Sequence, residues 1–209
     1  MKYGFNQFRP GLLVMLGVFA LAGGCKKDNE PTSGLSAKIQ NIVPQATLDD
    51  LEAKGLVVNQ GSQPPNIEGV FEISPYRLLS PYGPNDNFRQ GRVIGNYKYR
   101  FYQQQGDVVQ VDYKNASGSE TGTGKGALLA GSGNKFTLFL ETAGTDSGIS
   151  FKALDVVSGE IGPDGILNFQ IGLTMTQKTG DDKNTRLIPI NQARIWEDGD
   201  QLAKKVTTY

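Results

Sequence analysis

The chain has 209 residues, and its 21 Lys and Arg balance its 21 Asp and Glu, so the formal net charge is zero. This balance gives no reason to expect nucleic acid as a partner. The chain has no histidine and one cysteine, which excludes His-containing catalytic triads, zinc sites built on His or Cys, and disulfides within the chain. No spacing indicates a catalytic pair of acidic residues, and we expect no enzyme, no cofactor and no metal site.

Residues 1–24 have the layout of a secretory signal peptide. Lys2 and Arg9 supply positive charge, an apolar run follows over residues 12–22, and small residues come next. The apolar run is too short for a stable transmembrane helix, which needs about 20 apolar residues.

The five residues Leu21-Ala22-Gly23-Gly24-Cys25 resemble the lipobox of bacterial lipoproteins, although the usual leucine position, three before the cysteine, holds Ala22. The resemblance implies that the leader is removed and that Cys25 becomes the lipidated first residue, anchored by acyl chains such as palmitate. The alternative is an ordinary secreted protein with a free cysteine.

The segment Lys26-Lys27-Asp28-Asn29-Glu30 resembles the lysine-plus-acid signal found just after the cysteine in surface-exposed lipoproteins of Bacteroidetes. This resemblance implies a location in the cell envelope, anchored to the outer membrane, and favours the cell surface over the periplasmic face. The alternative interpretation is a solvated linker, which is compatible with the first.

Residues 25–40 are polar and have the composition of a flexible tether. Within residues 41–63 we predict a short helix followed by a linker. Thr47 is placed to cap this helix, and Leu48 and Leu51 share one of its faces.

Residues 64–209 form the main domain, in which apolar and polar residues alternate along short runs separated by turn-forming residues. Such hairpins in series predict an all-β fold, a meander barrel of about eight antiparallel strands, with a β-sandwich as the alternative. The expected strands are Ile67–Ile73, Tyr97–Phe101, Val109–Tyr113, Gly122–Ala130, Phe136–Leu140, Ile149–Ala153, Leu167–Met175 and Leu187–Glu197.

One connection, Ser74–Gly91, is long and carries aromatic residues. Loops of more than about 12–15 residues in compact domains are often lids or binding loops, although these rings could equally plug one end of the barrel. Tyrosines also gather on the strands after this loop, where they could line a pocket or stack on sugars, and core packing explains half of them equally well. The candidate ligand-binding residues are Tyr76, Tyr82, Phe88, Tyr97, Tyr99, Tyr102 and Tyr113.

The sequence Gly69-Val70-Phe71 in the first strand, the long first loop and the strand meander resemble lipocalin-like (calycin-type) barrels, among them lipocalin-like lipoproteins of Bacteroidetes. In lipocalins the first strand carries Gly-x-Trp, and an arginine near the last strand packs over that tryptophan. Here Phe71 stands in place of the tryptophan. The resemblance therefore implies structural roles for Gly69, Phe71, Arg194 and Trp196, with Arg194 as the packing arginine.

The run Gly122-Thr123-Gly124-Lys125-Gly126-Ala127 matches the dinucleotide-binding pattern Gly-x-Gly-x-x-Ala. That chemistry needs a helix directly after the loop, and none is predicted here. We interpret these glycines as a bulge or bend in a strand.

The predicted function is that of a membrane-anchored monomer whose barrel binds a small or apolar ligand at its mouth, under the Ser74–Gly91 loop. The alternative is a cell-surface interaction module that binds glycans or a partner protein through exposed aromatic residues, without catalysis. A cavity inside the barrel would favour the first, and a filled interior with outward-facing rings would favour the second.

Overall fold

The computed structural model describes residues 1–4 and 35–209. The predicted apolar leader, Cys25 and most of the predicted tether lie outside these residues. Residues 1–4 and residues 35–209 fall in two separate units, and only the second has regular secondary structure among its described residues. None of the helices in the described ranges is long and apolar enough to cross a membrane.

Antiparallel strands close into a ring of eight. The ring closes because β11 pairs with β1 on one side and with β9 on the other. The predicted all-β barrel is therefore confirmed, and the closed ring favours it over the sandwich. Its strands are β1 (Gly69–Ile73), β4 (Tyr97–Gln105), β5 (Val108–Asn115), β6 (Thr121–Ser132), β7 (Lys135–Asp146), β8 (Ile149–Ile161), β9 (Gly165–Thr179) and β11 (Leu202–Val206).

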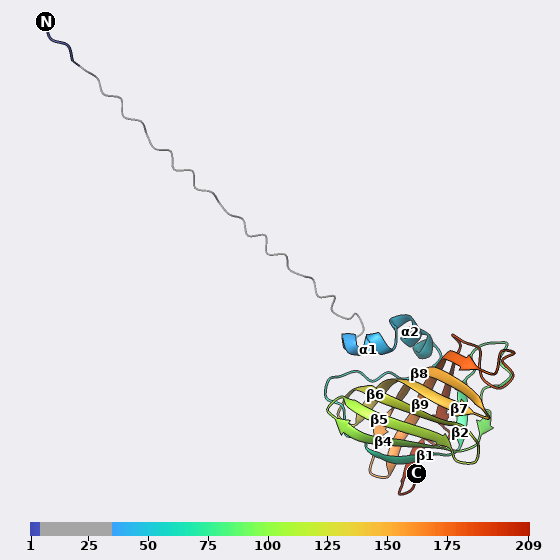
Figure 1. Cartoon of the computed structure of the whole chain (residues 1–209). Coiled ribbons are helices and arrows are strands. Elements are labelled where there is room, and N and C mark those ends of the chain that lie inside the picture. Colours follow the sequence, from blue (N-terminus) through green and yellow to red (C-terminus); the bar gives the residue numbers. More distant parts are fainter. Residues whose placement is uncertain (5–34) are drawn as a thin grey trace. The chain divides into compact units, whose positions relative to one another are not determined.

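Three shorter strands extend the sheet beyond β9, and Figure 1 labels one of them, β2. They are β2 (Tyr76–Ser80), β3 (Val93–Ile94) and β10 (Ala193–Asp198). β2 pairs with β10 on one side and with β3 on the other. The long first loop is thus shorter than predicted: its first part is strand β2, and only residues 81–92 connect the strands β2 and β3.

The last predicted strand, Leu187–Glu197, begins later in the structure than the sequence pattern indicates. Leu187 and Ile188 belong to the connection over residues 180–192, and strand β10 begins at Ala193. A turn precedes it, in which Asn191 adopts a φ of +64° and the Gln192 N–H donates to the Pro189 carbonyl. The chain then turns sharply through residues 199–201 into β11.

The alternation of side chains along the strands follows the sequence pattern. In β4 the side chains of Tyr97, Tyr99 and Phe101 are buried, while those of Lys98 and Arg100 point outward. Inward-facing residues of this kind form one apolar core inside the barrel, built from residues 67–203. The pattern predicted for β9 fails at one end, because Leu167 is 38% exposed.

Two short helices, α1 (Ala37–Ile42) and α2 (Gln45–Ala53), cover one side of the barrel (Figure 1). Their buried side chains form a second apolar core with outward-facing residues of β6, β7, β8 and β10. Gly172 of β9 allows this close packing, since a Cβ atom there would lie 2.8 Å from Cδ2 of Leu51.

The helical segment differs from the prediction in two ways. Helix α2 begins after Pro44, so Thr47 lies inside the helix and does not cap it. Helix α1 begins inside residues 25–40, which were predicted as tether, and its Ile39 side chain is buried against the barrel. The predicted face of Leu48 and Leu51 is confirmed, because both are buried.

The glycine run in β6 forms a bulge, as the sequence indicated. The pairing of β6 with β7 shifts register between Gly124 and Leu128, and Gly126 adopts a φ of +66°. The glycine at 122 keeps the inner face free of side chains, since a Cβ atom there would lie 2.4 Å from Cε1 of the Tyr113 ring.

Candidate functional site: a cavity at one end of the barrel

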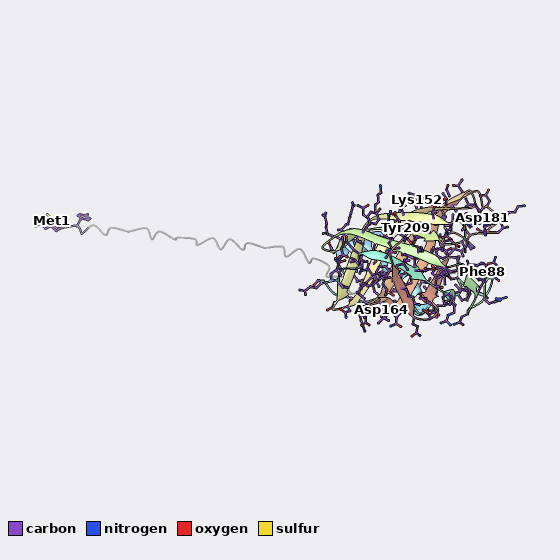
Figure 2. All side chains as sticks on the ribbon, turned by 90° about the horizontal axis from the view of Figure 1, so that it is seen from below. Met1, Phe88, Lys152, Asp164, Asp181 and Tyr209 are labelled. Carbon is purple, nitrogen blue, oxygen red and sulfur yellow. The ribbon has the colours of Figure 1, made fainter. Side chains whose placement is uncertain are left out.

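The barrel interior contains a cavity of about 440 Å³ at the end where residues 81–92 and residues 180–192 connect the strands. We call these connections the first and second mouth loops. Phe88 of the first loop and Leu187 of the second both line the cavity. Figure 2 labels Phe88 and Asp181, one residue from each loop, at the same end of the molecule. The volume is typical of a pocket for a small molecule.

Aromatic rings form much of the cavity wall. The Trp196 and Tyr76 rings stack with centroids 5.0 Å apart and an angle of 8° between their planes, and Tyr97 lies 4.4 Å from Tyr76. On neighbouring strands the Tyr99 and Tyr113 rings stack at 5.3 Å. Burial raises the pKa of these buried tyrosines above the ordinary value, so their hydroxyls remain neutral.

A buried carboxylate lies among these rings. Asp155 of β8 points into the barrel and is 1% exposed. Its Oδ2 accepts a hydrogen bond of 2.8 Å from the Thr142 hydroxyl, whereas its Oδ1 has no hydrogen-bond partner. Burial, together with the nearby Glu120 carboxylate, raises the pKa of Asp155 to about 7. A buried oxygen such as Oδ1 needs a hydrogen-bond partner, which the described residues do not supply.

A second carboxylate, Glu120, stands just before β6 on the same cavity. It accepts a hydrogen bond from the Tyr97 hydroxyl. Burial and the neighbouring Asp146 carboxylate raise the pKa of Glu120 to about 6, although the Tyr97 hydrogen bond acts in the opposite direction. The cavity therefore combines apolar rings with two acidic groups.

The first mouth loop is fixed over the cavity by a buried ion pair. Arg194 of β10 donates a 2.9 Å hydrogen bond from Nε to Asp86, and its Nη2 donates to the other carboxylate oxygen. Asp86 also accepts the backbone N–H groups of Tyr82 and Phe88. Burial alone would raise the pKa of Asp86, but these hydrogen bonds outweigh it and hold that pKa below its ordinary value.

The second mouth loop is held in a similar way. Lys178 forms a 2.9 Å ion pair with Asp181, and both side chains are almost fully buried. Asp181 also accepts the backbone N–H groups of Thr185 and Leu187 at 2.8 and 3.0 Å. These contacts outweigh the effect of burial and keep the pKa of Asp181 well below its ordinary value.

Five of the seven candidate ligand-binding residues line the cavity. The other two, Tyr82 and Tyr102, do not line it, which corrects the prediction. Tyr102 lies on the outer surface beside Arg100. Tyr82 belongs to the first mouth loop, and its hydroxyl donates to the Asn85 carbonyl. The five residues that line the cavity are Tyr76, Phe88, Tyr97, Tyr99 and Tyr113.

The four residues with implied structural roles are only partly placed as the resemblance suggests. Phe71 is buried in the barrel core, and a Cβ atom at Gly69 would lie 3.0 Å from its ring. Arg194, however, lies 4.3 Å from the centroid of the Phe88 ring and pairs with Asp86. The implied packing of Arg194 over the first-strand ring is therefore replaced by contacts to the first mouth loop, while Trp196 forms part of the cavity wall.

The sequence interpretation missed Asp155, Glu120 and Thr142. Asp155 carried a detectable signal, because it continues the inward positions of Phe151 and Ala153 along β8. An acidic residue in an apolar phase is costly to bury, so it marks a functional or structural position. Among the described residues no group of three or more acidic, histidine or cysteine side chains is arranged to hold a metal ion.

Comparison of the chain with protein-family models, with curated proteins and with solved structures finds no match.

Proposed function

We propose that this protein is a membrane-anchored binding protein whose barrel holds a small molecule in the cavity at its mouth. The observation that carries this proposal is the 440 Å³ cavity itself, which lies between aromatic rings on its strands and two fixed loops at its entrance. A barrel of eight strands has room for one small ligand when its own side chains do not fill it.

The chemistry of the lining supports a ligand with a substantial apolar part. The rings of Tyr76, Tyr99, Tyr113 and Trp196 line the cavity, and burial of apolar ligand surface against such rings is favourable. The alternative, an interaction module with outward-facing rings, has less support, because most of the predicted aromatic residues face inward.

The lipid anchor is part of the same proposal and depends on the sequence around Cys25. Kinship with lipocalin-like lipoproteins likewise remains a prediction, supported by the agreement of the barrel architecture with the fold that the resemblance implies. Neither adds information about which molecule is bound.

The test is thermal unfolding of the mature chain with Cys25→Ser, so that no lipid is attached, in the presence of a panel of fatty acids, aromatic metabolites, amines and sugars. A ligand present at 100 times its dissociation constant should raise the melting temperature by about 5–10 °C. Isothermal titration calorimetry of the compounds that act would give their affinities.

A matched pair of variants locates the binding. Leu173 of β9 lines the cavity. Leu173→Trp places a larger side chain there and should abolish the shift in melting temperature. Leu167→Trp, on the same strand but exposed, should leave it intact. The proposal fails if no compound raises the melting temperature, or if those that do act equally on both variants.

A further inference from the structure

The charged groups on the cavity do not all have partners. Arg194 forms an ion pair with Asp86. Arg186 lies 3.5 Å from Asp146 and donates a 2.7 Å hydrogen bond to the Ser147 hydroxyl. Within residues 35–209, Asp155 and Glu120 form no ion pair with any Lys or Arg side chain. Two acidic groups are thus left facing the cavity without a cation.

Asp155 is the more demanding of the two. It is almost completely buried, its Oδ1 has no hydrogen-bond partner, and it lines the cavity. A buried carboxylate is normally paired with a cation or fully hydrogen-bonded, because its desolvation is otherwise uncompensated. The free oxygen therefore marks the place where a ligand group of positive charge, or a hydrogen-bond donor, would be stabilised.

The rings beside these acids favour an organic cation. The faces of tyrosine and tryptophan rings attract an ammonium group within about 6 Å of the ring centroid. Tyr99 and Tyr113 border the cavity together with Asp155, and Tyr97 borders it together with Glu120, to which it donates. The carbon faces of the rings do not coordinate a metal ion, whereas they suit the apolar body of an amine.

We propose that the cavity binds a small organic cation, with its ammonium group held by Asp155 and Glu120 and its apolar body against the Tyr99, Tyr113 and Trp196 rings. This inference rests on the proposed function and specifies the charge of its ligand. A primary amine and a quaternary ammonium share this chemistry, and only the primary amine can also donate a hydrogen bond to Asp155 Oδ1.

The protonation of the two acids gives the proposal a pH dependence. The pKa of Asp155 is raised to about 7 and that of Glu120 to about 6, mainly by burial. A bound cation favours the ionised carboxylates, so affinity should increase between pH 5 and pH 8 as both lose their protons. The other charged groups that line the cavity are Asp146, Arg186 and Arg194, and its buried phenols remain neutral.

The test uses isothermal titration calorimetry at pH 8 on the unlipidated mature chain. The probes are hexylamine, phenethylamine and tryptamine, each compared with the alcohol and the carboxylate of the same carbon skeleton. At least one amine should bind more than about tenfold more tightly than its alcohol, and the carboxylates should not bind. A trimethylammonium form of that amine then separates charge from hydrogen bonding.

Three variants test the residues. Asp155→Asn keeps the shape of the side chain and should weaken amine binding by at least about tenfold, and Glu120→Gln should weaken it several-fold. Glu141→Gln, on the adjacent strand β7 but exposed on the outer face, should have no effect. Binding of the alcohol, where it is measurable, should change much less in Asp155→Asn. Thermal unfolding of each variant confirms that it is folded.

The outcomes separate this inference from the function on which it rests. If an alcohol or carboxylate binds in the cavity as tightly as its amine, the protein is a binding barrel but the cation inference is wrong. The same holds if Asp155→Asn leaves amine affinity unchanged, or if calcium or magnesium chloride binds and the amines do not. If no compound of this set or of the wider panel binds, both proposals fail.

Discussion

At the scale of single residues, Asp155 is the position where stability and binding conflict. Its carboxylate is buried with one oxygen unpartnered, so the ionised form is destabilised in the folded protein. A raised pKa means that the unfolded chain loses this proton first, and the folding free energy then becomes less favourable as the pH rises.

This conflict predicts that Asp155→Asn stabilises the protein at high pH. The penalty of Asp155 is absent below pH 4, grows between about pH 4 and pH 7 and then stays constant, because the folded pKa is about 7 and the ordinary value 3.8. The variant should therefore gain up to about 4 kcal/mol in the free energy of unfolding relative to the unchanged protein across this range. Urea unfolding at pH 4, 6 and 8 measures the difference.

A control separates this effect from the general effect of charge. Glu141→Gln removes an acidic group that is exposed on the outer face and lies 3.6 Å from Lys152. Because an exposed ion pair contributes at most about 1 kcal/mol, the difference from the unchanged protein should be smaller than that at every pH measured. A difference that stays constant with pH for Asp155→Asn would show that its carboxylate is not penalised by burial.

The residue scale also shows where sequence reasoning stops. Alternation alone places Tyr99 and Tyr113 inward, and both line the cavity. The same alternation places Tyr102 on the outer face, one position after the inward Phe101, so its candidacy depended on its closeness to other tyrosines in the sequence. Tyr82 lies in the first mouth loop, where no alternation applies. Asp155 was missed because the apolar residues at Phe151 and Ala153 were enough to predict a strand, so the acidic residue that continues their face was not considered.

At the scale of elements, glycines decide how closely neighbouring strands and side chains pack. The β6 strand has no side chain at 122, where the Tyr113 ring occupies the space. A ring packed against several neighbours cannot move aside as a flexible chain end would.

Gly122→Ala should therefore destabilise the barrel by about 1–3 kcal/mol, the usual cost of overpacking. Its added Cβ atom would lie 2.4 Å from Cε1 of Tyr113, too close for the packed ring to accommodate without strain. Gly83→Ala on the first mouth loop is the matched control, since nothing lies within 4 Å of a Cβ atom there, and it should change stability by less than about 1 kcal/mol. Chemical unfolding of both variants compares them, and equal stabilities would contradict the packing argument.

Strand β2 and helix α1 were both missed from the sequence, each for its own physical reason. Strand β2 begins directly after Pro75 and ends directly before Pro81, and these prolines suggested a loop. Its pairing with β10 is made with a strand more than 110 residues away, which local pattern does not reveal. Helix α1 has six residues, too few to display a clear helical period, and packing on the barrel stabilises it.

At the scale of the whole molecule, the series of strands from β4 to β9 was predictable because each of them pairs with the next strand in the sequence. That series needs only the alternation and the turns, both of which are local, whereas the pairings that close the ring join strands distant in the sequence. The cavity was not predictable, because its volume depends on how side chains from β2, β4, β5, β8, β9 and β10 meet inside the closed ring.

The lipid anchor is the prediction that belongs to this scale. Cys25→Ala should abolish incorporation of radiolabelled palmitate and move the protein from the detergent phase to the aqueous phase in a Triton X-114 partition. The barrel of the variant should be unchanged, because both apolar cores are built from residues 35–203. Continued labelling of the variant would show that Cys25 is not the site of acylation.

Both mouth loops are held by buried ion pairs, Arg194 with Asp86 and Lys178 with Asp181. Loops that become ordered only on binding would lose conformational entropy at that moment, and the measured affinity would be lower by that amount. Here the loops are ordered when the chain folds, so the binding site is preorganised. Complex formation should then require little rearrangement of the backbone, and the affinities of different molecules should depend mainly on how well each matches a shape that is already fixed.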